Sequence, residues 1–125
     1  MKVLVDTSVW IDHLRRGDPL LVELLTAGHI VVHSAVIGEL ACGTLRERDR
    51  VLRDLQRLPG LPEPRPEEAL HLVGCYQLWG RGLGWMDILL LASCRLGNAI
   101  LWTRDRALNA AAAELGLAYS PPRAG

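Results

Sequence analysis

Three short apolar runs constrain the fold of this chain most strongly. They are KVLVD at residues 2–6, HIVVH at 29–33 and AILWT at 99–103, and helical patterns separate them. Apolar runs of this length, bounded by polar residues, are typical of buried strands. Strands that alternate with helices predict a parallel sheet covered on both faces. We therefore expect an α/β fold with three α/β/α layers around a central parallel sheet.

Cap residues and apolar periodicity predict helices in the remaining segments. The expected ranges are 7–18, 19–27, 35–44, 45–58, 67–80, about 86–96 and 105–116. Four prolines in eight residues make 59–66 a rigid connector, and GRGLG at 80–84 is expected to be a loop. LAYS at 117–120 is expected to add a small last strand.

Length and composition indicate one domain over residues 1–125, in a soluble and cytoplasmic protein. Half of the residues are hydrophobic, and the 14 basic residues balance the 14 acidic ones, so net charge indicates no particular partner. The apolar run at 88–94 is too short to cross a membrane. The apolar start of the chain is also too short for a signal peptide.

The apolar neighbours of the cysteines and tryptophans in the sequence predict whether these residues are buried. Cys42, Cys75 and Cys94 form no CxxC pair and are expected to be reduced core residues. The tryptophans, Trp10, Trp79, Trp85 and Trp102, are expected to be mostly core, with Trp85 the one that reaches the mouth of a site.

Four carboxylates occupy positions that a parallel sheet brings together. Asp6 ends the first strand, and Asp105 lies just past the third. Glu39 is in the helix after the second strand, and Asp87 is in the first turn of the helix that leads to the third. Open parallel sheets bind ligands beyond the carboxyl ends of their strands. We therefore expect all four acids at one edge of the sheet.

Two of these acids lack local cations to neutralise them, whereas Asp105 is flanked by Arg104 and Arg106. Glu39 has no Lys or Arg between Arg16 and Arg46, and Asp87 stands in an apolar run after Arg81. Clustered carboxylates repel each other unless a cation lies between them. Mg²⁺ or Mn²⁺ prefers such oxygen ligands. The pattern indicates a phosphoryl-transfer site, in which one or two metals activate water and stabilise the leaving oxygen.

Each acid taken singly also has a structural interpretation, which the sequence leaves open. Asp6 could cap the first helix, and Asp87 could be a first-turn acid favoured by the helix dipole. Asp105 could cap the last long helix or pair with a flanking arginine. Glu39 has the weakest structural alternative, because it lies in the middle of an apolar helix.

Other chemistries find little support in this sequence. The histidines, His13, His29, His33 and His71, show no HxH or HExxH spacing for zinc. There is no GxGxxG or GxxxxGK[ST] nucleotide cradle and no G-x-S-x-G elbow. A phospho-receiver module needs a lysine near a late strand, and the only lysine here is Lys2.

Four blocks of the sequence resemble the motifs of PIN-domain ribonucleases. They are VLVDTSVWIDHLR, VIGELACGTLR, WGRGLGWMDILLLAS and LWTRDRAL, and they occur in the order of the family. More narrowly, they resemble VapC toxins of bacterial VapBC toxin–antitoxin pairs. The resemblance implies a single PIN domain, Mg²⁺- or Mn²⁺-dependent endonucleolytic cleavage of tRNA or ribosomal RNA, a VapB-like antitoxin partner and a homodimer.

The resemblance also carries residue roles, matched position by position. It places the catalytic and metal-binding acids at Asp6, Glu39, Asp87 and Asp105, and hydroxyls beside the site at Thr7 and Thr103. The family often has an acid and a Phe soon after the fourth acid, where this chain has Arg106, Ala107 and Leu108.

Several arginines are candidates for contacts with RNA. Arg81, Arg104 and Arg106 could hold flanking phosphates. The spacing of Arg46, Arg50, Arg53 and Arg57 predicts a stripe on one helix face, either solvated or bound to RNA or to an acidic antitoxin segment. Two alternative functions remain open at this point. One is an RNA-processing PIN nuclease outside any toxin–antitoxin pair, and the other is a catalytically silent binding module.

Overall fold

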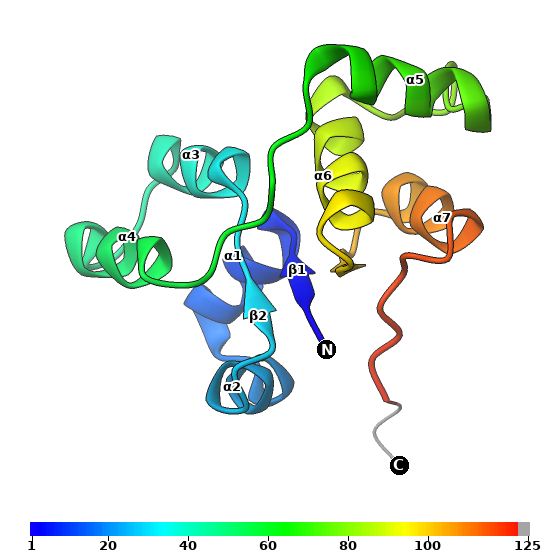
Figure 1. Ribbon diagram of the computed structural model, residues 1–125. Helices are drawn as coiled ribbons and strands as arrows, with labels where there is room; N and C mark the ends of the chain where they lie inside the picture. The colour runs from blue at the N-terminus through cyan, green and yellow to red at the C-terminus, as the bar shows by residue number, and fades with distance from the viewer. Residues whose placement is uncertain (123–125) are drawn as a thin grey trace.

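The computed structural model describes residues 1–122, which form three strands and seven helices (Figure 1). The strands are β1 (Val3–Val5), β2 (Ile30–Val31) and β3 (Ile100–Trp102). All of them pair in parallel, in the order β2-β1-β3. The predicted α/β class and parallel sheet are therefore confirmed.

Helices lie on both sides of this sheet. They are α1 (Thr7–Arg16), α2 (Pro19–Thr26), α3 (Ser34–Cys42), α4 (Arg48–Gln56), α5 (Pro66–Tyr76), α6 (Trp85–Leu96) and α7 (Arg106–Glu114). Figure 1 shows α2, α3 and α4 to one side of β1, and α5, α6 and α7 to the other. The chain crosses from β1 to β2 and then returns past β1 to β3. The connection from β1 to β2 contains α1 and α2, and the connection from β2 to β3 contains α3 to α6. Right-handed connections that run in opposite directions place helices on opposite faces of a sheet, which gives the three layers.

The centre of the sheet is fully buried. Val3, Leu4 and Val5 of β1 and Leu101 of β3 have no exposed surface. Burial of successive strand residues is expected where helices cover both faces of a parallel sheet. The apolar run of α6 packs into the same core and so holds the first turn of that helix in position. Within residues 1–122, no helix combines the length and the apolar character needed to cross a membrane.

Two helices are shorter than the apolar pattern predicted. α4 begins only at Arg48, because Glu47 has a left-handed backbone with φ of 50°. α5 ends at Tyr76, because Gln77 is left-handed with φ of 51°. A left-handed residue interrupts the helical hydrogen-bond ladder. As a result, Arg46 lies outside α4 and Arg57 is only its C-cap, so the predicted single stripe of arginines along one helix is wrong.

Two predicted strand segments are also reduced in the structure. The second strand covers only two residues, and Val32 forms an isolated bridge with Gly60 of the connector. The expected last strand is a single bridge between Ala118 and Leu101. This bridge extends the pairing beyond β3 without adding a full strand.

The burial predictions for cysteines and tryptophans are partly wrong. Cys94 is buried, and burial raises the pKa of its thiol to about 12. Cys42 and Cys75 are instead exposed, although all three cysteines are free as expected. The buried tryptophans are Trp10 and Trp102, whereas Trp79 and Trp85 are exposed. Apolar neighbours in sequence do not determine which face of a helix or loop meets solvent.

Candidate functional site

The order of the strands places a crevice at the carboxyl ends of β1 and β3. Successive crossovers run in opposite directions from β1, and ligands of open α/β sheets bind at such a reversal. Asp6 directly follows β1, and its backbone N–H donates to the carbonyl of Trp102 at 2.9 Å. The two strands therefore deliver Asp6 and Thr103 to the same corner.

Two hydroxyls orient the Asp6 carboxylate. Thr103 Oγ1 donates to Asp6 Oδ2 at 2.7 Å, and Ser8 Oγ donates to the same oxygen at 2.9 Å. Asp6 occupies the N-cap position of α1, but its side chain makes no capping bond there. The structural interpretation of Asp6 as a helix cap is therefore wrong. Sequence reasoning missed Ser8, whose place beside Asp6 looked like ordinary helix-start chemistry.

Glu39 is linked to the same corner through α1. Thr7 Oγ1 donates to Glu39 Oε2 at 2.6 Å. Thr7 is the residue after Asp6, and α1 packs against α3, which carries Glu39. The Glu39 side chain is exposed, so its second oxygen faces solvent rather than the core.

Asp87 lies in the first turn of α6, and the charges of the other three acids act on it. Gly84 N–H donates to Asp87 Oδ2 at 2.9 Å. Burial raises the pKa of Asp87, and the negative charges of Asp105, Asp6 and Glu39 raise it further, against the opposing effect of the Gly84 bond. The four carboxylates therefore share one electrostatic environment, as the sequence predicted from their positions.

Asp105 joins the cluster and also caps a helix. Its Oδ1 accepts the N–H of Leu108 at 2.9 Å, so it is the N-cap of α7. Its own N–H donates at 3.1 Å to Thr103 Oγ1, the hydroxyl that in turn donates to Asp6. One threonine hydroxyl therefore joins the first and fourth acids.

The four carboxylates have one property in common: each uses a single oxygen within the protein. The second oxygens are Asp6 Oδ1, Glu39 Oε1, Asp87 Oδ1 and Asp105 Oδ2, and they have no hydrogen-bond or ion-pair partner in the described part of the chain. Neighbouring carboxylate oxygens without a cation repel one another. This donor set is therefore suited to a hard divalent cation such as Mg²⁺.

The geometry is that of an open site rather than a closed metal cage. Across residues 1–122, no three His, Cys, Asp or Glu side chains converge closely enough to enclose an ion. Mg²⁺ commonly binds through one or two carboxylates and fills its remaining positions with water and substrate phosphate. The residues present fit that mode of binding, and the mutual effect of the acids on the Asp87 pKa supports it.

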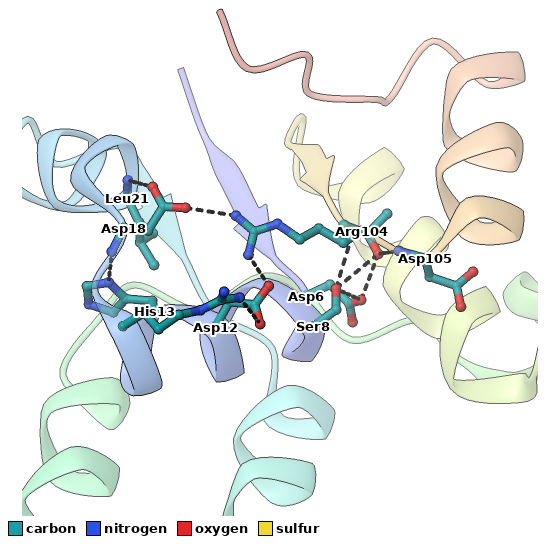
Figure 2. Close-up of polar contacts among 10 residues, drawn as sticks. Asp6, Ser8, Asp12, His13, Asp18, Leu21, Arg104 and Asp105 are labelled. Carbon is teal, nitrogen blue, oxygen red and sulfur yellow. Dashed lines mark hydrogen bonds and ion pairs between the residues drawn. The ribbon is translucent and has the colours of Figure 1, made fainter. Parts of the chain in front are cut away.

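The arginine nearest the site is engaged elsewhere. Arg104 Nη1 lies 2.5 Å from Asp12 Oδ2, and its Nη2 lies 2.8 Å from Asp18 Oδ2. Figure 2 shows the guanidinium reaching between these two acids and away from Asp105. The Arg104 N–H also donates to Ser8 Oγ at 3.1 Å. Arg104 therefore clamps the end of β3 onto α1 and the start of α2.

The other two candidate arginines differ from each other. Arg81 pairs with Glu114 of α7 at 2.5 Å. Arg106 is exposed at the start of α7 and has no ion-pair partner within residues 1–122. For Arg81 and Arg104, contact with a phosphate would require breaking an internal ion pair. Arg106 needs no such exchange.

Comparisons with known proteins cover almost the whole chain. A family model described as the PIN domain matches residues 3–114. Ribonuclease VapC32 from two strains of Mycobacterium tuberculosis, CDC 1551 / Oshkosh and H37Rv, is 53% identical over 119 residues, or 94% of this chain and 96% of the relative. The crystal structure of PAE2754 from Pyrobaculum aerophilum matches with a TM-score of 0.60 at 19% identity, over 89% of this chain and 79% of that one. The last similarity concerns the fold alone.

Proposed function

The chain belongs to the PIN-domain family, close to its VapC ribonucleases, and from this premise we propose that it is a toxin that cleaves RNA endonucleolytically with a divalent metal. The observation that carries the proposal is the set of four carboxylates at one sheet edge, each with one oxygen unpartnered in the described part of the chain. VapC-type PIN ribonucleases are generally metal-dependent, which agrees with this donor set.

We assign the metal-binding roles from the position of each acid. Asp6 and Asp87 would hold Mg²⁺, with Mn²⁺ as an alternative, and Glu39 and Asp105 would complete the site. When bound, a divalent ion supplies Lewis acidity that polarises the phosphate and lowers the pKa of water. The raised pKa of Asp87 means that a neighbouring positive charge would stabilise its ionised form.

The remaining groups of the site orient the acids and the substrate. Thr103 and Ser8 hold Asp6 through one oxygen, and the other oxygen stays available. Thr7 does the same for Glu39, whose Oε1 can accept a hydrogen bond from the attacking water and so direct it at the phosphorus. Arg106 would hold a flanking phosphate of the RNA.

The proposed partners follow from the same family assignment. The substrate is RNA, with tRNA or ribosomal RNA as the expected class. A VapB-like antitoxin would bind the protein and block the site, and the active form would be a cytoplasmic homodimer. An RNA-processing nuclease outside a toxin–antitoxin pair would have the same site but no neutralising partner.

Purified protein tests this assignment directly. Wild type is expected to cut total RNA in Mg²⁺ and to stop when EDTA is added. Asp6→Asn and Asp87→Asn should both be inactive, because each removes one charge from the donor set. If either variant cut RNA like wild type, with the same Mg²⁺ dependence, the site assignment would be wrong.

Expression in a bacterial host separates a toxin from a processing enzyme. A toxin should arrest growth, and coexpression of a small neighbouring gene product should relieve the arrest. Mapping the cleaved ends in total RNA after induction would identify the target. Growth unaffected by active enzyme would favour the RNA-processing alternative.

A further inference from the structure

The four tryptophans divide into a buried pair and an exposed pair. Trp10 and Trp102 are each 4% exposed, whereas Trp79 is 63% exposed and Trp85 is 47% exposed. Indoles are large and mainly apolar, and exposed ones are enriched where a protein binds a partner. Both exposed indoles flank one short segment, WGRGLGW at residues 79–85, which we call the tryptophan loop.

The tryptophan loop is anchored on three sides. Leu78, just before it, is 2% exposed and belongs to the core. Arg81 bonds Glu114 of α7 at 2.5 Å, and the N–H of Gly84 bonds Asp87 at 2.9 Å. The loop is therefore held in place, so its exposed indoles lose little conformational entropy when a ligand binds.

These anchors place the loop between two of the four acids. A Cβ built on Gly82 would lie 4.0 Å from the Cβ of Ala107, two residues after Asp105. At its other end the loop enters α6, in which Trp85 is two residues before Asp87. The loop therefore contacts both ends of α7, through Arg81 at Glu114 and through Gly82 at Ala107, and its Gly82–Trp85 end borders the carboxylate site.

We propose that Trp79 and Trp85 bind unpaired nucleobases of the RNA substrate by stacking, with Trp85, two residues before Asp87, holding the base nearer to the phosphate that is cleaved. This inference rests on the proposed function and names two side chains that would bind unpaired bases of its substrate. Proteins read such RNA by stacking splayed bases on aromatic side chains. Bases within a duplex stack on each other and are not available to these indoles.

The composition of the loop favours nucleobases over a protein partner. Gly80, Gly82 and Gly84 have no side chains, so the two indoles are the large exposed apolar groups that this loop offers to a ligand. Arg106, exposed at the adjoining start of α7, adds a cation for the phosphate that follows a stacked base. Alternating flat rings and positive charge suit a nucleic acid strand.

A binding experiment tests the proposal without cleavage. Asp6→Asn protein would be titrated with a fluorescein-labelled single-stranded RNA of about 12 nucleotides, and with an abasic strand of equal length. Trp79→Ala and Trp85→Ala should each weaken binding of the RNA by roughly 5- to 100-fold, with Trp79→Tyr and Trp85→Tyr retaining most of it. Leu70→Ala, which removes another exposed apolar side chain on α5, is the matched control and should change nothing.

The abasic strand isolates the contribution of the bases. It should bind weakly and equally to all variants, because only phosphate contacts remain. If the tryptophan variants lost affinity for the abasic strand as much as for the RNA, the proposal would be wrong. Unchanged affinity of these variants for the RNA would also overturn it. If the variants kept RNA but lost a copurified antitoxin, the loop would be a protein-binding surface and the proposal would be wrong.

Kinetics in the wild-type background separate this inference from the proposed function. Trp79→Ala and Trp85→Ala should raise KM for RNA while kcat changes little, because stacking positions the substrate and does not touch the reacting atoms. A wild-type protein that cuts no RNA in Mg²⁺ would refute the proposed function itself. Active variants with unchanged KM would refute only the stacking site.

Discussion

Asp18 and Asp87 occupy similar places at the starts of helices, yet their carboxyl groups are shifted in opposite directions. Asp18 is the N-cap of α2 and accepts the N–H groups of Leu20 and Leu21. Burial alone would raise the pKa of Asp18, but the bond from Leu21, the guanidinium of Arg104 and the bond from Leu20 together lower it. Asp18 is therefore stabilised as a carboxylate by groups of the protein itself.

Within residues 1–122, Asp87 has one backbone hydrogen bond and no cation partner. Burial raises the pKa of Asp87, three neighbouring carboxylates raise it further, and only the bond from Gly84 lowers it. The two acids differ mainly in the sign of the charge beside them, as Figure 2 shows for Asp18 and Arg104. An acid paired with an internal cation is structural, whereas an acid surrounded by other acids indicates a site that takes its cation from outside.

The largest expected contrast between these two acids is in catalysis. Asp87→Asn should lower RNA cleavage by on the order of 100-fold or more, because removal of even an outer-shell group near a metal costs about 10- to 100-fold. Asp18→Asn should stay within a few-fold of wild type. Rates measured on one RNA in Mg²⁺ check this contrast. Equal loss in both variants would remove the distinction between a structural and a catalytic acid.

Metal binding should stabilise the protein through Asp87 and not through Asp18. At a Mg²⁺ concentration of 100 times its Kd, binding adds about 2.7 kcal/mol to the free energy of unfolding. We expect this gain in wild type and in Asp18→Asn, and its loss in Asp87→Asn. Thermal unfolding with Mg²⁺ and with EDTA measures it. A Mg²⁺-dependent gain that survived in Asp87→Asn would place the ion elsewhere.

The positions of the carboxylates could be predicted because they depend on features that are adjacent in the sequence, such as the end of a strand. Asp6 and Asp105 follow apolar runs that could only be strands, and a parallel sheet brings strand ends to one edge. Glu39 was identified because no cation lies near it in sequence. Each of these inferences needs only the alternation of strands and helices, which is the strongest signal in the chain.

The contacts of Arg104 and the exposure of Trp79 could not be predicted in the same way. Arg104 is adjacent to Asp105 in sequence, but its partners are Asp12 and Asp18, which are 92 and 86 positions away. Which acid an arginine meets across such a distance depends on how α1 and α2 pack. Trp79 lies two residues beyond the left-handed Gln77 that ends α5, so the apolar periodicity of that helix does not apply to it.

Removal of Arg104 should make Asp18 resemble Asp87. Arg104→Ala deletes both ion pairs, leaves Asp18 without its cation and leaves Asp12 only its pair with Arg16. We expect this to lower the free energy of unfolding by about 1–2 kcal/mol. Arg81→Ala is the matched control, because it removes one ion pair rather than two, and the acid in that pair, Glu114, is more exposed than Asp18. Urea unfolding at neutral pH compares them. Equal stability of the two variants would show that Arg104 is not a structural clamp.

The smallest expected effect is the pH dependence of stability, where the two acids should differ in sign. The folded pKa of Asp18 lies below its ordinary value of 3.8, so its contribution to stability is present above that pH and is lost as the pH falls through the folded pKa. The folded pKa of Asp87 lies above 3.8, so the metal-free protein binds this proton more tightly than the unfolded chain. The free energy of unfolding of the metal-free protein must therefore fall as the pH rises from about 4 through the folded pKa of Asp87.

Urea unfolding of metal-free protein in EDTA between about pH 4 and 7 resolves this difference. Asp87→Asn should gain stability relative to wild type as the pH rises, because the variant has no charge to repel the other acids. Asp18→Asn should be less stable than wild type by a nearly constant amount over this range, because the contribution of Asp18 is lost only below about pH 4. Saturating Mg²⁺ should make wild type more stable than Asp87→Asn, because the bound ion neutralises the Asp87 carboxylate, which this variant lacks. The order of wild type and Asp18→Asn should not change. Parallel pH profiles for the two variants would mean that the neighbours of Asp87 do not act on it as repelling charges.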